Sequence, residues 1–139
     1  MGHMERSHAR SGSPFEDAIG FSRAVRVGNV VSVSGTAPVW PDGHVDPDPA
    51  VQTRRCWEIV LAALADLGAG AADVVRTRQY VVSADVAEAV GSVHGEVFGD
   101  VRPASTMVMV AGLLDPRWLV EVEADAVVAG HAEGVSGNR

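Results

Sequence analysis

The sequence lacks several features that define large classes of protein. It has a single cysteine, Cys56, so no disulfide can form within the chain, which favours a reducing compartment. No apolar run reaches the roughly 18–20 residues that a membrane-spanning helix needs. No signal-peptide hydrophobic region follows the first methionine. These absences predict a cytoplasmic protein that does not associate with a membrane.

Positive charge and catalytic sequence motifs are also scarce. Lys and Arg number 11 against 18 Asp and Glu, a formal net charge of -7, so we expect no nucleic-acid partner. The five histidines form no HxxxH or HxH pair, and a zinc site needs three or four convergent ligands, so we expect no metal. Without a GxSxG, GxGxxG or Walker sequence, neither a hydrolase triad on a nucleophile elbow nor a nucleotide cofactor is supported. We expect no cofactor.

The length and apolar content are those of one globular domain. At 139 residues and 47% hydrophobic residues, the chain is long enough to bury a core of its own. We place the domain at residues 15–129. Residues 1–14 are expected to be a flexible tail that begins with an expression scar at residues 1–4, and residues 130–139 a second flexible tail.

Hydrophobic periodicity predicts the helices of this domain. Asp48 and Pro49 mark the start of a helix whose apolar positions recur at helical spacing, and Gly68 marks its end. Cys56 falls on the apolar stripe of that helix, which indicates a core residue. Ser83 is expected to cap a second helix with a stripe of valines.

The remaining segments alternate like strands. Two short strands flank a tight turn at Gly28-Asn29, and further strands are expected at residues 74–82, 106–110 and 119–128. In the strand from Val74, we expect Val75, Thr77, Gln79 and Val81 to share one face. The order β-β-α-β-α-β-β predicts an α+β fold with a single sheet and both helices on one face. The uncovered face favours a symmetric homo-oligomer.

The last strand carries the residues with the most evident chemical potential. Glu121, Glu123 and Asp125 share one face of this strand, opposite the apolar residues. One interpretation is a solvated strand face. The other is that one carboxylate lines a pocket, has a perturbed proton affinity and polarises a water or a substrate amine.

Several segments resemble one family in both order and spacing. They are Ile19-Gly20-Phe21, Val27-Gly28-Asn29, Val33-Ser34-Gly35-Thr36-Ala37-Pro38, Gln52-Thr53-Arg54, Asp73-Val74-Val75-Arg76-Thr77, Arg102-Pro103-Ala104-Ser105-Thr106 and Val120-Glu121-Val122-Glu123-Ala124. Across about residues 19–128 the chain resembles the RidA family, also called the YjgF/YER057c/UK114 family and labelled "endoribonuclease L-PSP". The resemblance implies a chorismate-mutase-like fold and a homotrimer with pockets between subunits.

The resemblance also implies a site and a reaction. In the deaminase branch an arginine follows the Pro-Ala pair and clamps the carboxylate of an imine or enamine derived from an amino acid. A glutamate on the last strand activates the water that hydrolyses the imine. Here the glutamate is Glu121, and the catalytic role is assigned to it. The substrate-binding residues implied are Phe21, Ser34, Gly35, Ser105, Thr106 and Met107.

This chain departs from the deaminase pattern where that branch binds its substrate. Ser105 stands at the position of the arginine, Phe21 at that of a tyrosine, and Gly91 aligns with an asparagine. Losing a charge-assisted clamp costs about 1.5–3 kcal/mol of binding per hydrogen bond, so ordinary 2-iminoacid deamination is not expected. We expect the ligand site where Ser105-Thr106-Met107 meets Glu121.

Three functions stay open at this point. The first is an enzyme without metal or organic cofactor that hydrolyses or rearranges an imine, an enamine or a related electrophile. The second is a non-catalytic small-molecule binder or chaperone-like trimer. The third is a ribonuclease, which the negative charge and the absence of a His/Lys cluster disfavour.

Overall fold

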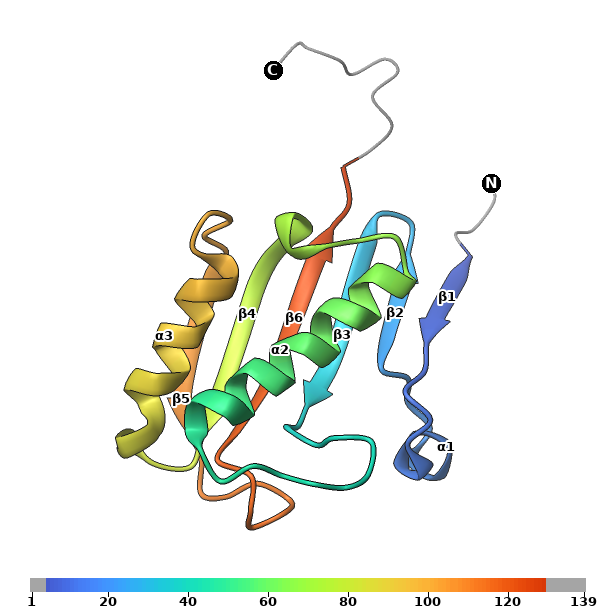
Figure 1. Cartoon of the computed structure of the whole chain (residues 1–139). Helices are drawn as coiled ribbons and strands as arrows, with labels where there is room; N and C mark the ends of the chain where they lie inside the picture. The colour runs from blue at the N-terminus through green and yellow to red at the C-terminus, as the bar shows by residue number, and fades with distance from the viewer. Residues whose placement is uncertain (1–4, 130–139) are drawn as a thin grey trace.

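The protein forms one mixed β-sheet with its two long helices on the same side (Figure 1). A computed structural model describes residues 5–129. The strand order is β1-β2-β3-β6-β4-β5, in which β4 and β5 run parallel and the other neighbours antiparallel. The elements are β1 (Arg6–Ala9), α1 (Pro14–Ile19), β2 (Ala24–Val27), β3 (Val30–Thr36), α2 (Pro49–Asp66), η1 (Ala71–Asp73), β4 (Val74–Val81), η2 (Ala84–Val86), α3 (Ala87–Phe98), β5 (Ala104–Met109) and β6 (Val120–Val127).

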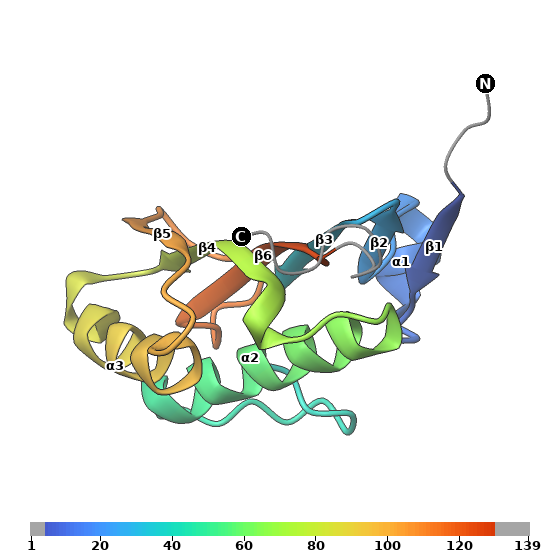
Figure 2. The same cartoon turned by 90° about the horizontal axis from the view of Figure 1, so that it is seen from above.

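Helices α2 and α3 lie side by side against one face of the sheet, as the view from above shows (Figure 2). The core lies between these helices and the sheet, and its largest fully buried side chains include Trp57 and Phe98. From the sheet, Val120 and Val122 are fully buried against them. The predicted α+β fold with both helices on one face is therefore confirmed.

Helix α2 follows the start and stop signals in the sequence. The Asp48 carboxylate accepts a hydrogen bond from the Val51 backbone N–H, and Pro49 occupies the first helical position, where no N–H partner is needed. Just beyond the helix, Gly68 has a φ of 80°, a left-handed conformation that glycine adopts without strain. Cys56 lies in the core as predicted, and burial raises the pKa of its thiol.

Two local predictions around β4 and α3 are wrong. Ser83 precedes the short 3-10 turn η2 rather than α3, and its side chain makes no capping hydrogen bond. Val75 does not share the face of Thr77, because the β4–β6 register shifts between Val74 and Arg76. This irregularity turns Val74 into the core and leaves Val75 48% exposed.

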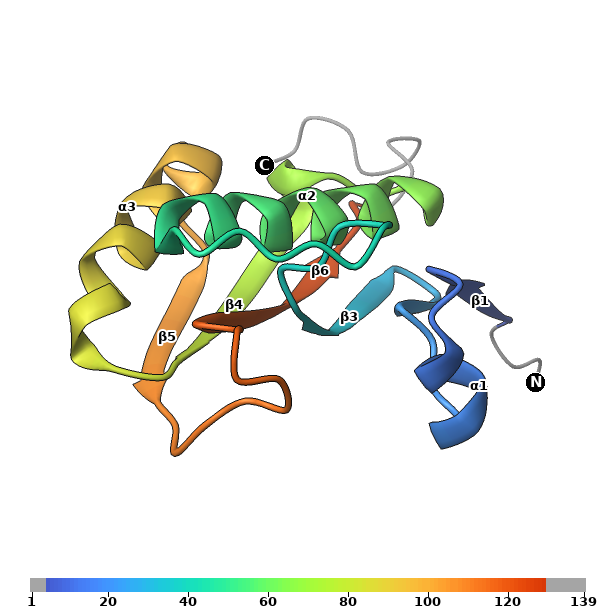
Figure 3. The ribbon, with the colours of Figure 1, turned by 60° about the horizontal axis from the view of Figure 1, so that its bottom comes forward.

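The N-terminal segment differs from the flexible tail expected at residues 1–14. Residues 6–9 form β1, which pairs with β2 and adds a sixth strand, and α1 begins at Pro14 (Figure 3). Ser13 accepts a hydrogen bond from Phe15, so Ser13-Pro14 is a helix start of the same kind as Asp48-Pro49. Buried Glu16 accepts hydrogen bonds from Arg10 and Ser11 and so connects α1 to the residues that follow β1. The scar predicted at residues 1–4 and the tail at 130–139 lie outside the described residues.

Within residues 5–129, the structure has neither a membrane-spanning helix nor a cluster of metal ligands. No helix in this range is both long enough and apolar enough to span a bilayer. No group of three or more His, Cys, Asp and Glu side chains in the same range is placed to hold a metal ion.

Candidate functional site

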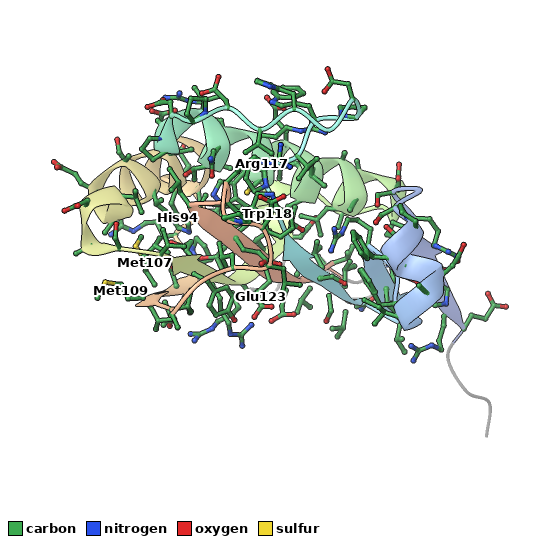
Figure 4. All side chains as sticks on the ribbon, turned by 90° about the horizontal axis from the view of Figure 1, so that it is seen from below. His94, Met107, Met109, Arg117, Trp118 and Glu123 are labelled. Atoms are coloured by element: carbon green, nitrogen blue, oxygen red, sulfur yellow. The ribbon has the colours of Figure 1, made fainter. Side chains whose placement is uncertain are left out.

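The acidic residues of β6 lie on the sheet face away from the helices, where Figure 4 shows Glu123. Two of the three carboxylates are engaged by β4. Glu123 accepts a hydrogen bond from the Tyr80 hydroxyl at 2.7 Å, and this bond is the main cause that raises the pKa of Tyr80. Arg78 lies between Glu123, at 3.5 Å, and Asp125, at 3.2 Å. Cross-strand partners therefore explain Glu123 and Asp125 without a ligand.

Glu121 stands apart from this network. Among the described residues, no side chain forms a hydrogen bond or ion pair with its carboxylate, which is half-buried. Burial raises the pKa of Glu121, whereas the positive charge of Arg23 opposes that shift. A half-buried carboxylate with a raised pKa and unused hydrogen-bonding capacity is suited to accept a proton.

The position of Glu121 depends on the absence of a side chain at Gly35. A Cβ at Gly35 would lie 2.6 Å from Glu121 Oε2, well inside van der Waals contact. Strand β3 is irregular here, because its register against β6 shifts between Val33 and Thr36. Gly35 thus provides the space in which the carboxylate lies, and the structure brings these two predicted site residues together.

Arg23 completes this corner, and the sequence analysis missed it. Its Nη2 donates a hydrogen bond to the Gly35 carbonyl oxygen at 2.5 Å, and its guanidinium lies 5.8 Å from the centre of the Phe21 ring. Its Nε is buried and has no hydrogen-bond partner among the described residues. Burial lowers the pKa of Arg23, while Glu16 and Glu121 oppose that shift. The available signal was an arginine two residues after the Phe21 motif, just before the first strand of the Gly28-Asn29 hairpin.

Phe21 and Ser34 lie beside this corner. Ser34 donates its hydroxyl hydrogen to the Ser22 carbonyl oxygen at 2.6 Å, so it holds the turn that carries Phe21. Phe21 lines a hollow of about 280 Å³ together with residues of the N-terminal segment, among them Arg10 and Asp17. We call Phe21, Arg23, Ser34, Gly35 and Glu121 the first half-site.

A second group of predicted residues lies at the opposite edge of the sheet. Ser105 pairs with Thr77, and Met107 with Gln79, so these side chains point to the helix side of β4 and β5. Figure 4 shows Met107 and His94 at this end of the molecule. Met107 packs against the core, and its Cε would lie 3.9 Å from a Cβ at Gly91, an ordinary contact.

Polar side chains surround the exposed Ser105. Thr77 Oγ1 lies 2.8 Å from Ser105 Oγ and 2.8 Å from His94 Nε2. Gln79 Nε2 donates to Ser105 Oγ at 3.0 Å. His94 stacks edge-on against Trp57, and burial lowers its pKa. We call Ser105 and Met107, with Thr77, Gln79 and His94 behind them, the second half-site.

Thr106 belongs to neither half-site. It pairs with Arg78 of β4, so its side chain lies on the face away from the helices. Its hydroxyl accepts a hydrogen bond from Arg76 Nη2 at 2.8 Å. Because neighbouring residues of a strand point to opposite faces, Ser105 and Thr106 cannot present their hydroxyls to the same ligand from one strand.

The two half-sites do not meet within one chain, so the expected junction of Ser105-Thr106-Met107 with Glu121 does not form inside a single subunit. Strand β4 separates β5 from β6, and two steps across a sheet span roughly 10 Å. The side chains also lie on opposite faces, since Glu121 pairs with Tyr80 and Ser105 with Thr77. The linear sequence does not reveal this separation, because it does not show which strands are neighbours.

Comparisons with known proteins agree on one family. The profile of the family described as "Endoribonuclease L-PSP" matches residues 13–128. A protein of Streptomyces coelicolor is 40% identical over 118 residues, covering 84% of this chain and 88% of that protein. A RutC family protein of Haemophilus influenzae is 37% identical over 130 residues, covering 90% of this chain and 94% of that protein.

A solved structure supports the same assignment. The Mycobacterium tuberculosis protein Rv2704, described as a member of the YjgF/YER057c/UK114 family, has 46% sequence identity and a TM-score of 0.82. The match covers 89% of this chain and 100% of that one. Together with the fold, these likenesses show that the chain belongs to the RidA (YjgF/YER057c/UK114, endoribonuclease L-PSP) family.

Proposed function

We propose that this protein hydrolyses or rearranges a small imine, enamine or related electrophile in a pocket between the subunits of a cytoplasmic homotrimer. The observation that carries the proposal is the division of the site. One chain holds a carboxylate corner at Glu121 and a hydroxyl cluster at Ser105 that cannot reach each other. A ring of identical subunits joins two different patches of each chain, so it brings the first half-site of one subunit to the second half-site of the next.

The surface supports such a ring. On the face away from the helices, Val30, Val108 and Val127 are 50%, 43% and 46% exposed. At the edge of the sheet, Met109 of β5 is 63% exposed, next to the second half-site. Apolar side chains that are exposed on a sheet face gain free energy when a partner covers them.

The proposed chemistry needs only groups that are already placed. The ionised Glu121 carboxylate removes a proton from a water molecule as the oxygen attacks the C=N carbon. Glu121 delivers that proton to the imine nitrogen, which gives a neutral carbinolamine. The carboxylate then transfers the hydroxyl proton of the carbinolamine to the amine nitrogen as the C–N bond breaks. The products are a carbonyl compound and ammonia. Arg23 stabilises the ionised form of Glu121, and Gly35 leaves room for the carboxylate to approach the water.

A release assay tests this function directly. Ammonia and carbonyl release are measured over a panel of imines generated in situ, with the parent protein and with Glu121→Gln. We expect a loss of about 10²–10⁴-fold in turnover for Glu121→Gln, the usual contribution of a general base. Asp125→Asn is the matched control, because it removes a carboxylate from the same face of β6 and is expected to keep activity. A Glu121→Gln protein as active as the parent contradicts the mechanism.

Sedimentation tests the assembly separately from the chemistry. A trimer at micromolar concentration is expected. A monomer under those conditions contradicts the pocket between subunits, since neither half-site contains the residues of the other.

The alternative is a trimer that binds a small molecule without turning it over. Ser105, in place of a guanidinium, favours this reading because it removes the charged substrate clamp of the deaminase branch. Thermal stabilisation by a ligand, without product release over the same panel, would select this alternative.

A further inference from the structure

Ser105 is the only exposed member of an otherwise covered polar cluster in the second half-site. Thr77 is 0% exposed and Gln79 is 2% exposed, although both side chains are polar. His94 lies between α3 and the sheet, packed against Trp57 and Phe98. Buried polar groups need hydrogen-bond partners, and here they find them in one another and in Ser105.

The hydrogen bonds that Ser105 already makes determine which of its donor and acceptor positions are free for a ligand. A hydroxyl has one hydrogen to donate and two lone pairs to accept with. Thr77 donates its hydrogen to Ser105 Oγ, and Gln79 Nε2 donates to the same oxygen, so both Ser105 lone pairs are used. We assign His94 the tautomer with its hydrogen on Nε2, so that the ring donates to Thr77 Oγ1. The Ser105 hydroxyl hydrogen has no partner among the described residues.

The chain of donors therefore runs outward from His94 through Thr77 to Ser105. Successive hydrogen bonds in one direction polarise one another, which makes the last hydroxyl a better donor. The cluster carries no formal charge while His94 is neutral, the form that burial favours by lowering the pKa of His94. The nearest arginine of β4, Arg76, points to the other face and donates to Thr106. In the first half-site, the negative charges of Glu16 and Glu121 act on the positive charge of Arg23.

We propose that Ser105 is the ligand-binding donor of the pocket and that it selects a neutral carbonyl oxygen, such as that of an amide, over a carboxylate. This inference rests on the proposed pocket between subunits and adds the substrate class to it. A polarised hydroxyl satisfies an uncharged oxygen fully. A carboxylate would be desolvated without a matching positive charge, which is unfavourable.

The test is a binding measurement with two ligands of one shape, pyruvamide and pyruvate. They differ only in the amide or the carboxylate next to the same ketone. Affinity of the intact trimer for each is measured by titration calorimetry or ligand-observed NMR at millimolar concentrations. We expect pyruvamide to bind more tightly than pyruvate. Equal affinities, a preference for pyruvate or no binding of pyruvamide would overturn the inference.

Variants along the chain of donors separate a role in recognition from a role in folding. Ser105→Ala and Thr77→Val are expected to weaken pyruvamide binding by roughly 3- to 10-fold, the value of one neutral hydrogen bond. Thr77→Ser keeps the hydroxyl and is expected to restore binding. Thr53→Val is the matched control, because it makes the same change at another buried threonine, outside both half-sites. Unchanged pyruvamide affinity in both Ser105→Ala and Thr77→Val would contradict the assignment.

Ser105→Arg supplies the reciprocal test. Restoring the guanidinium is expected to reverse the preference in favour of pyruvate, because a bidentate cation suits a carboxylate. A Ser105→Arg protein that keeps the parent's preference argues against Ser105 as the selecting residue. These binding measurements involve no turnover, so they can be interpreted even if the protein does not hydrolyse imines. The release assay can likewise be interpreted if Ser105 does not select the ligand.

Discussion

The two half-sites use different means to hold a reactive oxygen. At Glu121 the oxygen is charged, receives no hydrogen bond from the described residues and depends on empty space at Gly35 and on the field of Arg23. At Ser105 the oxygen is neutral and is held by two hydrogen bonds from buried side chains. The first arrangement leaves a group free to take up a proton. The second fixes a hydroxyl in one orientation and suits recognition.

The largest effect is expected from filling the space beside Glu121. In Gly35→Ala the new Cβ displaces the carboxylate, since it would lie 2.6 Å from Oε2. Misplacing a catalytic group by about 1 Å lowers turnover by roughly 100-fold. The Glu121 side chain can move aside, so we expect little change in the midpoint of thermal unfolding. Gly112→Ala, with open space around its Cβ, is the control. Full activity in Gly35→Ala would mean that Glu121 acts from another position.

Removing the positive charge beside Glu121 tests whether Arg23 controls the ionisation of the carboxylate in the first half-site. Burial raises the pKa of Glu121 and Arg23 opposes that shift, so Arg23→Met moves the pKa further up. The base must be ionised to act, so the acid limb of the pH–rate profile is expected to move to higher pH. Arg23→Lys keeps a charge and is expected to stay closer to the parent. An acid limb that does not move in Arg23→Met separates Arg23 from the function of Glu121.

In the second half-site, the neutral His94 is expected to make the fold sensitive to acid. Burial lowers the pKa of His94 below its ordinary value of 6.5, so below about pH 6.5 the unfolded chain binds a proton more readily than the folded one. The contribution of His94 to stability is complete above that pH and is lost as the pH falls towards the folded-state pKa. In denaturant titrations between pH 7 and pH 5, His94→Gln is expected to show a shallower loss of stability. A slope equal to the parent's would place the acid sensitivity elsewhere.

The smallest effect is expected outside both half-sites, in the network that engages Glu123. Tyr80→Phe removes the 2.7 Å hydrogen bond to Glu123, while Arg78 remains nearby. Denaturant unfolding should show a loss of about 1 kcal/mol. Turnover is expected to stay close to that of the parent. A large loss of turnover would instead connect Glu123 to the proposed reaction.

Local signals in the sequence were sufficient for much of the framework. The alternation of β6 correctly separates its buried residues from Glu121, Glu123 and Asp125. Helix α2 starts and ends where Asp48-Pro49 and Gly68 indicate. These features depend on neighbours along the chain. Strand β1 was missed because four mostly exposed residues carry little pattern, and their pairing with β2 is a long-range contact.

The candidate site shows where sequence reasoning stops. The family resemblance singled out Gly35, Ser105 and Glu121, but not Arg23, which reaches Gly35 from the position just before β2. It also grouped Ser105 with Thr106, although the pleat places their hydroxyls on opposite faces. Assigning the face of each residue required the register of β4 against β5 and β6.

By itself the sequence indicated several candidate residues for chemistry, though not Arg23, and most of the stretches that form helices and strands, because these depend on side-chain type and on periodicity along the chain. Tertiary structure alone decided which of those residues share a corner. It placed Glu121 over Gly35 beside Arg23 and connected Ser105 to His94 through Thr77. It also separated these two corners by a strand and a sheet face. The physical reason is that strand order and register are set by long-range packing of the core, which the local pattern of residues does not encode.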